Sequence, residues 1–176
     1  MDILKAATDW AKAELISTPF FILFGLIFVA TSMGFWQWGK TDLARAYIIP
    51  MLVAGVLLVT IGAGLFYSNK TRIVQFEQAY TTDASVFVVS EIARAEATLK
   101  EYQTIVFKAI PIIIVFCALG IVFLEHPSWR ASCITTIAMM IVILLIDGTA
   151  HARIAGYYKE LQKVATKTDR SNELHP

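Results

Sequence analysis

A carboxylate, an imidazole and a guanidinium stand close together near the end of the last apolar run of this sequence. They belong to Asp147, His151 and Arg153. Residues four apart share a helix face, so Asp147 and His151 could pass protons or cations together, or contribute to a metal site. Two ligands do not define a metal site, and charge is tolerated at headgroup depth. We therefore expect a polar membrane site whose members pair locally, with no metal and no cofactor.

Other polar groups give weaker chemical signals. No phosphate-binding loop, dinucleotide fingerprint, HExxH pair or nucleophile elbow occurs in the sequence, which predicts that the protein is not an enzyme. Cys117 and Cys133 lie inside apolar runs, where we expect them to act as small packing residues. Glu91, Arg94 and Glu96 fit the solvated face of a helix, with an acid-base cluster at a partner interface as the alternative.

The elements that would position these groups are long apolar segments. Apolar residues make up 57% of the 176 residues and charged residues 16%, whereas soluble domains have about 25% charged residues. A helix needs about 20 residues to cross a hydrocarbon core of ~30 Å, and barrel strands would instead alternate over ~10 residues. Four runs approach the helical length: 19–36, 46–67, 105–124 and 131–146, the last with its flanks from 129 to about 150. The sequence thus predicts an all-α, integral membrane four-helix bundle of two transmembrane hairpins, with helices extending into the cytoplasm.

Five segments follow from this pattern. They are an amphipathic N-terminal helix (1–17), hairpin 1 (18–67), a cytoplasmic helical segment (68–104), hairpin 2 (105–150) and a C-terminal helix and tail (151–176). Within the cytoplasmic segment, apolar residues recur at alternating steps of four and three, as in a helix-bundle seam: Val88, Ile92, Ala95, Leu99, Tyr102 and Val106. Thr82 and Asp83 are suitable caps for the start of that helix.

The distribution of basic residues predicts the orientation. Twelve of the 15 Lys and Arg residues fall in the termini, the central segment and its flank, and three fall in the hairpin turns: Lys40, Arg45 and Arg130. Since basic residues are retained on the cytoplasmic side, we expect a multi-pass protein of the cell (inner) membrane with its N-terminus and C-terminus in the cytoplasm. The residues expected to anchor the outer interface flank the turns: Trp36, Trp38, Tyr47 and Trp129.

Small residues in the second run predict close helix contacts, because they allow two membrane helices to approach. The candidates are Gly55, Gly62 and Gly64. Whether they meet a helix of the same chain or of another copy is open at this stage.

Two functional classes fit this architecture, with the lipid bilayer as a partner in both and no nucleic acid in either. The first is a non-catalytic membrane subunit that forms a homo-oligomer, or docks a membrane or cytoplasmic protein, through its cytoplasmic helical bundle. The alternative is a homo-oligomeric ion channel or pore. Its wall would use the hydroxyl residues of the spans: Thr31, Ser32, Thr60, Thr135 and Thr136. A coupled transporter is disfavoured because the centres of the spans lack ionisable residues.

The topology yields a first prediction. A reporter fused after Pro176 should behave as cytoplasmic and one inserted at Thr41 as external, because the basic residues of the tail resist translocation. Paired alkaline phosphatase and fluorescent protein fusions would measure this. The opposite pattern at both positions would invert the assignment.

Overall fold

The computed structural model describes the backbone of residues 3–173 and the side chains of residues 3–166, and this described part is all-α, without strands. It consists of α1 (Ile3–Trp38), α2 (Asp42–Ala46), α3 (Ile48–Thr82), α4 (Ala84–Glu101), the π-helix η1 (Tyr102–Ala109), α5 (Ile110–Phe123) and α6 (Pro127–Glu173). Four helical stretches are long and apolar enough to cross a membrane: Ile3–Trp38, Asp42–Thr82, Ala84–Phe123 and Pro127–Thr166.

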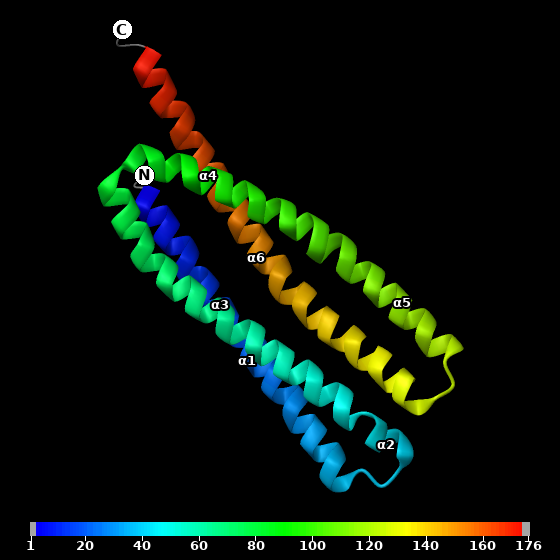
Figure 1. Cartoon of the computed structure of the whole chain (residues 1–176). Coiled ribbons are helices and arrows are strands. Elements are labelled where there is room, and N and C mark those ends of the chain that lie inside the picture. The colour runs from blue at the N-terminus through cyan, green and yellow to red at the C-terminus, as the bar shows by residue number, and fades with distance from the viewer. Residues whose placement is uncertain (1–2, 174–176) are drawn as a thin grey trace.

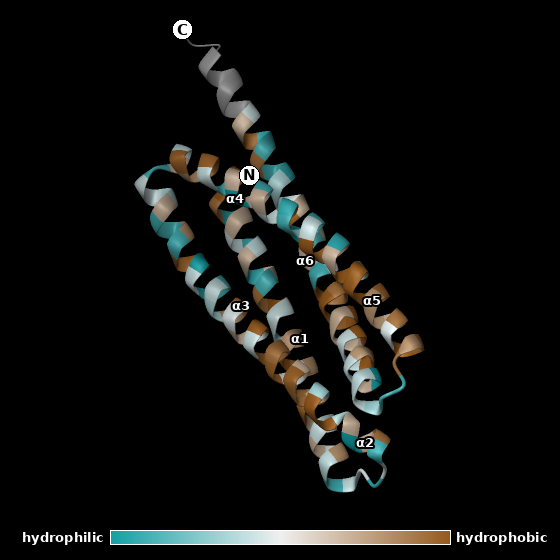
Figure 2. Ribbon diagram, turned by 45° about the vertical axis from the view of Figure 1, so that its right-hand side comes forward, coloured by the Kyte–Doolittle hydropathy of each residue, from teal (hydrophilic) through white to brown (hydrophobic). Residues whose placement is uncertain are grey.

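The helices form two hairpins whose turns lie at the same end (Figure 1). The α1–α2–α3 turn and the α5–α6 turn are together at that end, and both termini and the α3–α4 corner are at the other. Apolar residues dominate α5 and the parts of α1 and α3 toward the hairpin turns, while hydrophilic residues are frequent toward the termini (Figure 2). α1 and α3 cross each other, α6 lies between this pair and α5, and α4 crosses from the first hairpin to the second (Figures 1 and 2).

The corner between α3 and α4 is defined by a side-chain cap. Asp83 has an extended backbone, and its carboxylate accepts hydrogen bonds from the backbone N–H groups of Ser85 (2.9 Å) and Val86 (3.1 Å). The Ser85 hydroxyl donates a third, at 2.7 Å, and these bonds hold the pKa of Asp83 below its ordinary value. Residue 83 was one of the two predicted caps; its carboxylate fills the role because helix N-termini present unpaired donors.

Two hydrophobic clusters stabilise the molecule at different levels. One lies toward the termini and joins α1, α3, α4 and α6 through Ile3, Ala7, Trp10, Phe76, Phe87, Ile154 and Leu161, among others. The other lies in the apolar half and joins α1, α3 and α6 through Phe21, Phe28, Ala54, Leu58, Val142 and Ile146. The terminal cluster lies in the helical segments that the sequence predicts to be cytoplasmic. These segments therefore have a packed core of their own.

Glycine sets the distance between α1 and α3. A Cβ built on Gly55 would lie 2.7 Å from the Gly25 carbonyl oxygen and 2.9 Å from the Val29 backbone nitrogen, and one on Gly62 would lie 2.9 Å from the Phe21 Cβ. Two of the three predicted contact glycines therefore face α1 within the same chain. Gly64, by contrast, would meet nothing within 4 Å.

A wide helical turn precedes Pro111. The sequence allows a kink at this proline; the structure instead has the π-helix η1, which ends at Ala109 just before it. Proline lacks an N–H group and its ring crowds the carbonyl four residues earlier, and a wider turn relieves both problems. The helix thus stays continuous from α4 into α5 (Figure 1), while its side chains are rotated relative to an α-helix.

The glycine contacts yield a matched pair of variants. Gly55→Val should destabilise the protein by about 1–3 kcal/mol, because the new side chain forces α1 and α3 apart. Gly64→Val places the same side chain on the same helix with open space around it, so it should change stability much less. Unfolding by titrated denaturing detergent would measure both. Equal losses for the two variants would contradict the packing described here.

Candidate functional site

The polar residues predicted near the end of the last span separate in the structure. Asp147 lines a cavity between the two hairpins. The His151 ring instead packs edge-on against Tyr102 and Phe107, with ring centroids 5.8 and 5.0 Å away. No group of three or more metal-ligating side chains occurs among the residues the structure describes.

The main partner of Arg153 is not a local residue of the last span, as expected, but Glu14 of α1. The Arg153 Nε and Nη2 donate to the two carboxylate oxygens of Glu14, at 3.0 and 3.3 Å, and its Nη1 donates to the Thr149 hydroxyl at 3.5 Å. The ion pair joins α6 to α1, residues 139 apart in the chain. Sequence spacing could not reveal it because the partner belongs to the other end of the chain.

Glu91 also differs from expectation: it is buried rather than on a solvated face, with 6% of its surface exposed. Arg94 donates Nε and Nη2 to the two carboxylate oxygens of Glu91, at 2.8 and 2.6 Å. The Tyr157 hydroxyl of α6 donates to Glu91 Oε2 at 3.0 Å. Burial and the neighbouring Glu91 charge raise the pKa of Tyr157, so this hydroxyl remains a donor. Three donors therefore compensate the buried carboxylate.

Trp10 of α1 forms the centre of this cluster. Its ring stacks on Tyr157 with centroids 5.4 Å apart and an interplanar angle of 10°. The Arg94 guanidinium carbon lies 4.6 Å from the centroid of the Trp10 ring, and that of Arg72 lies 5.5 Å from it. Both distances suit cation–π attraction. The indole Nε1 is buried and has no hydrogen-bond partner among the residues that the structure describes.

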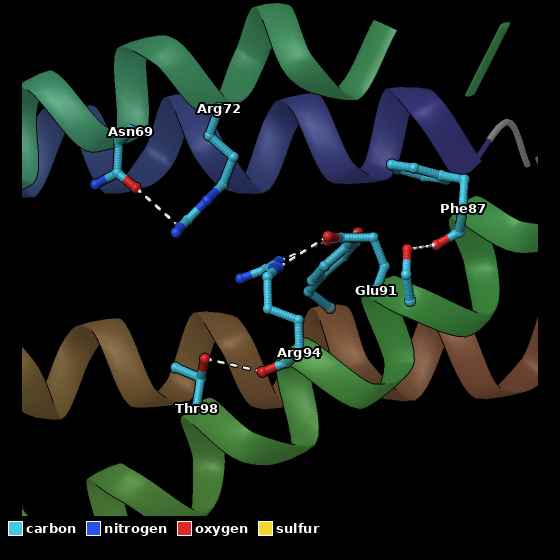
Figure 3. A network of polar contacts seen from close by, with 8 residues as sticks. Asn69, Arg72, Phe87, Glu91, Arg94 and Thr98 are labelled. Atoms are coloured by element: carbon cyan, nitrogen blue, oxygen red, sulfur yellow. Dashed lines mark hydrogen bonds and ion pairs between the residues drawn. The ribbon is translucent and has the colours of Figure 1, made fainter. Parts of the chain in front are cut away.

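A cavity of about 370 Å³ lies beside this cluster. It is enclosed by α1, α3, the α4–η1 junction and α6, and its lining includes Trp10, Asn69, Arg72, Arg94 and Asp147. Figure 3 shows the side chains of Arg72 and Arg94 extending into the same space from α3 and α4. Burial lowers the pKa of Arg72, and the positive charge of Arg94 lowers it further. Two guanidinium groups thus share one partly buried site.

Carboxylates also line the cavity, those of Glu14, Glu101 and Asp147. Burial raises the pKa of Tyr102, and the carboxylates of Asp147 and Glu14 raise it further. The positive charge of Arg94 lowers the pKa of Arg72, whereas the carboxylates of Glu91 and Glu14 raise it. Asp147, Tyr102 and the two guanidinium groups all line this cavity.

The remaining predicted residues lie away from this cavity. Trp36, Trp38 and Trp129 are highly exposed near the hairpin turns, and Tyr47 stacks on Phe35 with centroids 5.5 Å apart. Of the predicted pore hydroxyls, Thr31 and Thr60 donate to carbonyls of their own helices, and Ser32 donates to the Ile48 carbonyl at 2.7 Å. The Thr135 hydroxyl is buried and has no hydrogen-bond partner within the described part of the chain.

Sequence reasoning missed most of the cluster. Trp10 and Glu14 lie in the predicted N-terminal amphipathic helix, and Arg72 is one of the twelve basic residues that predict the orientation, but the sequence assigns no site to them or to Asn69. The available signal was helical spacing, because Trp10 and Glu14 are four apart and Asn69 and Arg72 three apart. That spacing places each pair on one face but does not tell which helices meet.

No protein-family model, curated protein or solved structure is significantly similar to this chain. Functional inference therefore depends on the geometry alone.

The buried ion pair yields a prediction with an internal control. Glu91→Ala should destabilise the protein by about 2–3 kcal/mol, because Arg94 and the Tyr157 hydroxyl lose their acceptor in a desolvated place. Glu160→Ala removes the Lys163–Glu160 pair, which has the same spacing but is well exposed, and should cost less than about 0.5 kcal/mol. Detergent-titrated unfolding at one pH would compare them. Similar small losses would show that the Glu91 network contributes little.

Proposed function

We propose that this protein is a non-catalytic, four-span membrane subunit that self-associates through the outer face of α4. In this proposal the four long apolar helices form a bundle in the cell membrane, with both termini in the cytoplasm. The position of the two termini at one end supports an even number of crossings, and the excess of basic residues there supports the cytoplasmic side (Figure 1).

The carrying observation is an exposed apolar stripe on α4, outside the predicted spans. Val86, Val89, Ala93 and Ala97 recur at steps of three and four and are all exposed. Val86 and Val89 expose 62% and 69% of their surface. The opposite face of α4 packs through Phe87, Glu91 and Ala95, so the stripe is a second apolar surface on the same helix. Contiguous apolar surface in a water-facing segment favours an interaction site.

The charges near the stripe favour a second copy of this chain as its partner. Lys100 follows the stripe along α4, and Glu96 and Glu101 lie on its two sides, all of them exposed. Two copies in one membrane share their orientation, so a two-fold axis would bring their α4 helices together in the same sense. Each Lys100 would then meet a carboxylate of the other copy. Ala93 and Ala97, four apart, would let the helices approach closely.

The polar cluster supports a structural rather than a catalytic role for most of its members. The Glu91 carboxylate accepts hydrogen bonds from Arg94 and Tyr157, and the Glu14 carboxylate accepts them from Arg153. A catalytic carboxylate needs to be free for the substrate, and these two serve as bridges between helices. The channel alternative gains little from the hydroxyl residues, because Ser32 binds a neighbouring backbone carbonyl and Thr31 and Thr60 bind their own helices.

The decisive measurement is the mass of the particle in lipid nanodiscs, by native mass spectrometry over a range of protein-to-lipid ratios. We expect a dimer in the wild type. Ala93→Glu should weaken association at least tenfold, because two like charges would face each other at the axis. Gln162→Glu, an equal charge change at an exposed position of α6, should leave the dimer intact.

Other outcomes would redirect the proposal. A monomer at every ratio would overturn self-association. A closed ring of three or more copies with measurable conductance would favour the channel. A dimer that resists Ala93→Glu would place the interface elsewhere than on α4.

A further inference from the structure

The guanidinium end of the cavity presents unused hydrogen-bond donors. The Nε and Nη2 groups of Arg94 donate hydrogen bonds to Glu91 (Figure 3). Its Nη1 group donates no hydrogen bond within the described part of the chain. Arg72 donates through Nη1 to the Asn69 side-chain oxygen at 3.3 Å, and no ion pair with a carboxylate is present for it among the residues the structure describes. Asn69 is 94% buried and lines the cavity, and its amide nitrogen donates no hydrogen bond within the described part of the chain.

These donors suit an anion. Three carboxylates also line the cavity: Glu14, which pairs with Arg153, and those of Glu101 and Asp147. Arg94 pairs with Glu91, so Arg72 is the lining cation without a carboxylate partner among the described residues. Two guanidinium groups and an amide N–H₂ form the kind of donor set that binds the oxygens of a phosphate, which guanidinium groups contact in pairs.

The cavity is bordered by apolar side chains on the side that faces the predicted spans. Its lining continues through Leu65, Ile105 and Val106. Leu65 precedes the predicted end of the second span and Ile105 begins the third, and both are strongly exposed, at 40% and 58%. α3 packs against α1, α4 and α6, whereas η1 packs against α4, α5 and α6. α3 and η1 therefore border the cavity from two sides, with apolar side chains at bilayer depth.

We propose that this cavity binds the phosphate of an anionic phospholipid, held by Arg72, Arg94 and Asn69, with the acyl chains leaving along Leu65 and Ile105 between α3 and η1. Basic pockets between membrane helices at the cytoplasmic side are suited to such headgroups. A free phosphate ion has the same polar chemistry, but it would make no use of the apolar border. Arg72, Arg94 and Asn69 do not belong to the apolar stripe on α4, so the proposal does not require self-association; Glu101 flanks that stripe and also lines the cavity.

The test uses the delipidated full chain in a neutral detergent. Phosphatidylglycerol, diacylglycerol with the same acyl chains, and inorganic phosphate are titrated separately, and bound adducts are resolved by native mass spectrometry. We expect phosphatidylglycerol to bind at least tenfold more tightly than diacylglycerol, and inorganic phosphate to bind weakly. The wild type alone can therefore decide between a lipid, a bare anion and a general apolar surface.

Two neutralising variants then locate the site. Arg72→Gln should weaken phosphatidylglycerol binding at least tenfold. Lys70→Gln removes the same charge two residues away, at an exposed position of the same helix, and should change binding less than twofold. Asn69→Ala is a second variant, with an expected loss of severalfold, in case Arg72→Gln does not fold as judged by circular dichroism.

Three results would overturn the proposal. Equal binding of diacylglycerol would remove the role of the phosphate. Inorganic phosphate binding as tightly as the lipid would make the cavity a free-anion site. Equal losses for Lys70→Gln and Arg72→Gln would reduce the effect to general attraction between a basic surface and anionic lipid.

Discussion

The buried carboxylate of Glu91 is the constraint on which the terminal half of the molecule depends. It brings Arg94 of its own helix and the Tyr157 hydroxyl of α6 to one point, and both then contact the ring of Trp10. An unpaired carboxylate at this depth would be very unfavourable, so α1, α4 and α6 have to meet in one arrangement. The Arg153–Glu14 pair connects α6 and α1 a short distance along the same helices. Polar groups thus determine which helices pack, while apolar side chains supply most of the buried area around them.

The apolar half follows a different physical rule. In a bilayer, association of helices gains little from burying apolar surface, because lipid is equally apolar. Close packing has to replace it, and Gly25, Gly55 and Gly62 allow α1 and α3 to approach until backbone atoms touch side chains. In the second hairpin a Cβ on Gly120 of α5 would lie 3.0 Å from the Cys133 Sγ of α6, which is a side-chain atom, and Gly148 and Gly156 face nothing within 4 Å among the described residues. This difference makes the first hairpin the more tightly packed of the two at its glycines.

The cavity lies where the polar terminal half and the glycine-packed apolar half adjoin. α4 has to cross over α1 and α6 to bring Glu91 to Tyr157, and it then continues through η1 toward the second hairpin (Figures 1 and 2). α3 stays with α1, where its glycines hold it. The wide turn before Pro111 presents Tyr102, Ile105 and Val106 to the space between them. A polar cavity bordered by apolar side chains is the consequence, and such a cavity is suited to bind a small amphiphile.

The sequence by itself determined the all-α character, four apolar helices, the bend at Asp83 and the small residues on α3, because each depends on local composition or on helical spacing. It also determined that the polar residues would concentrate outside the apolar runs. Only the tertiary structure decided that Glu91 is buried, that Arg153 pairs with Glu14 rather than with Asp147, and that Arg72 and Arg94 share a cavity. The physical reason is that a helix face shows one periodicity whichever partner covers it. A charged residue on that face is solvated or paired according to contacts made across 66 residues of chain for Glu91 and Tyr157 and 139 for Arg153 and Glu14. Such contacts leave no local pattern in the sequence.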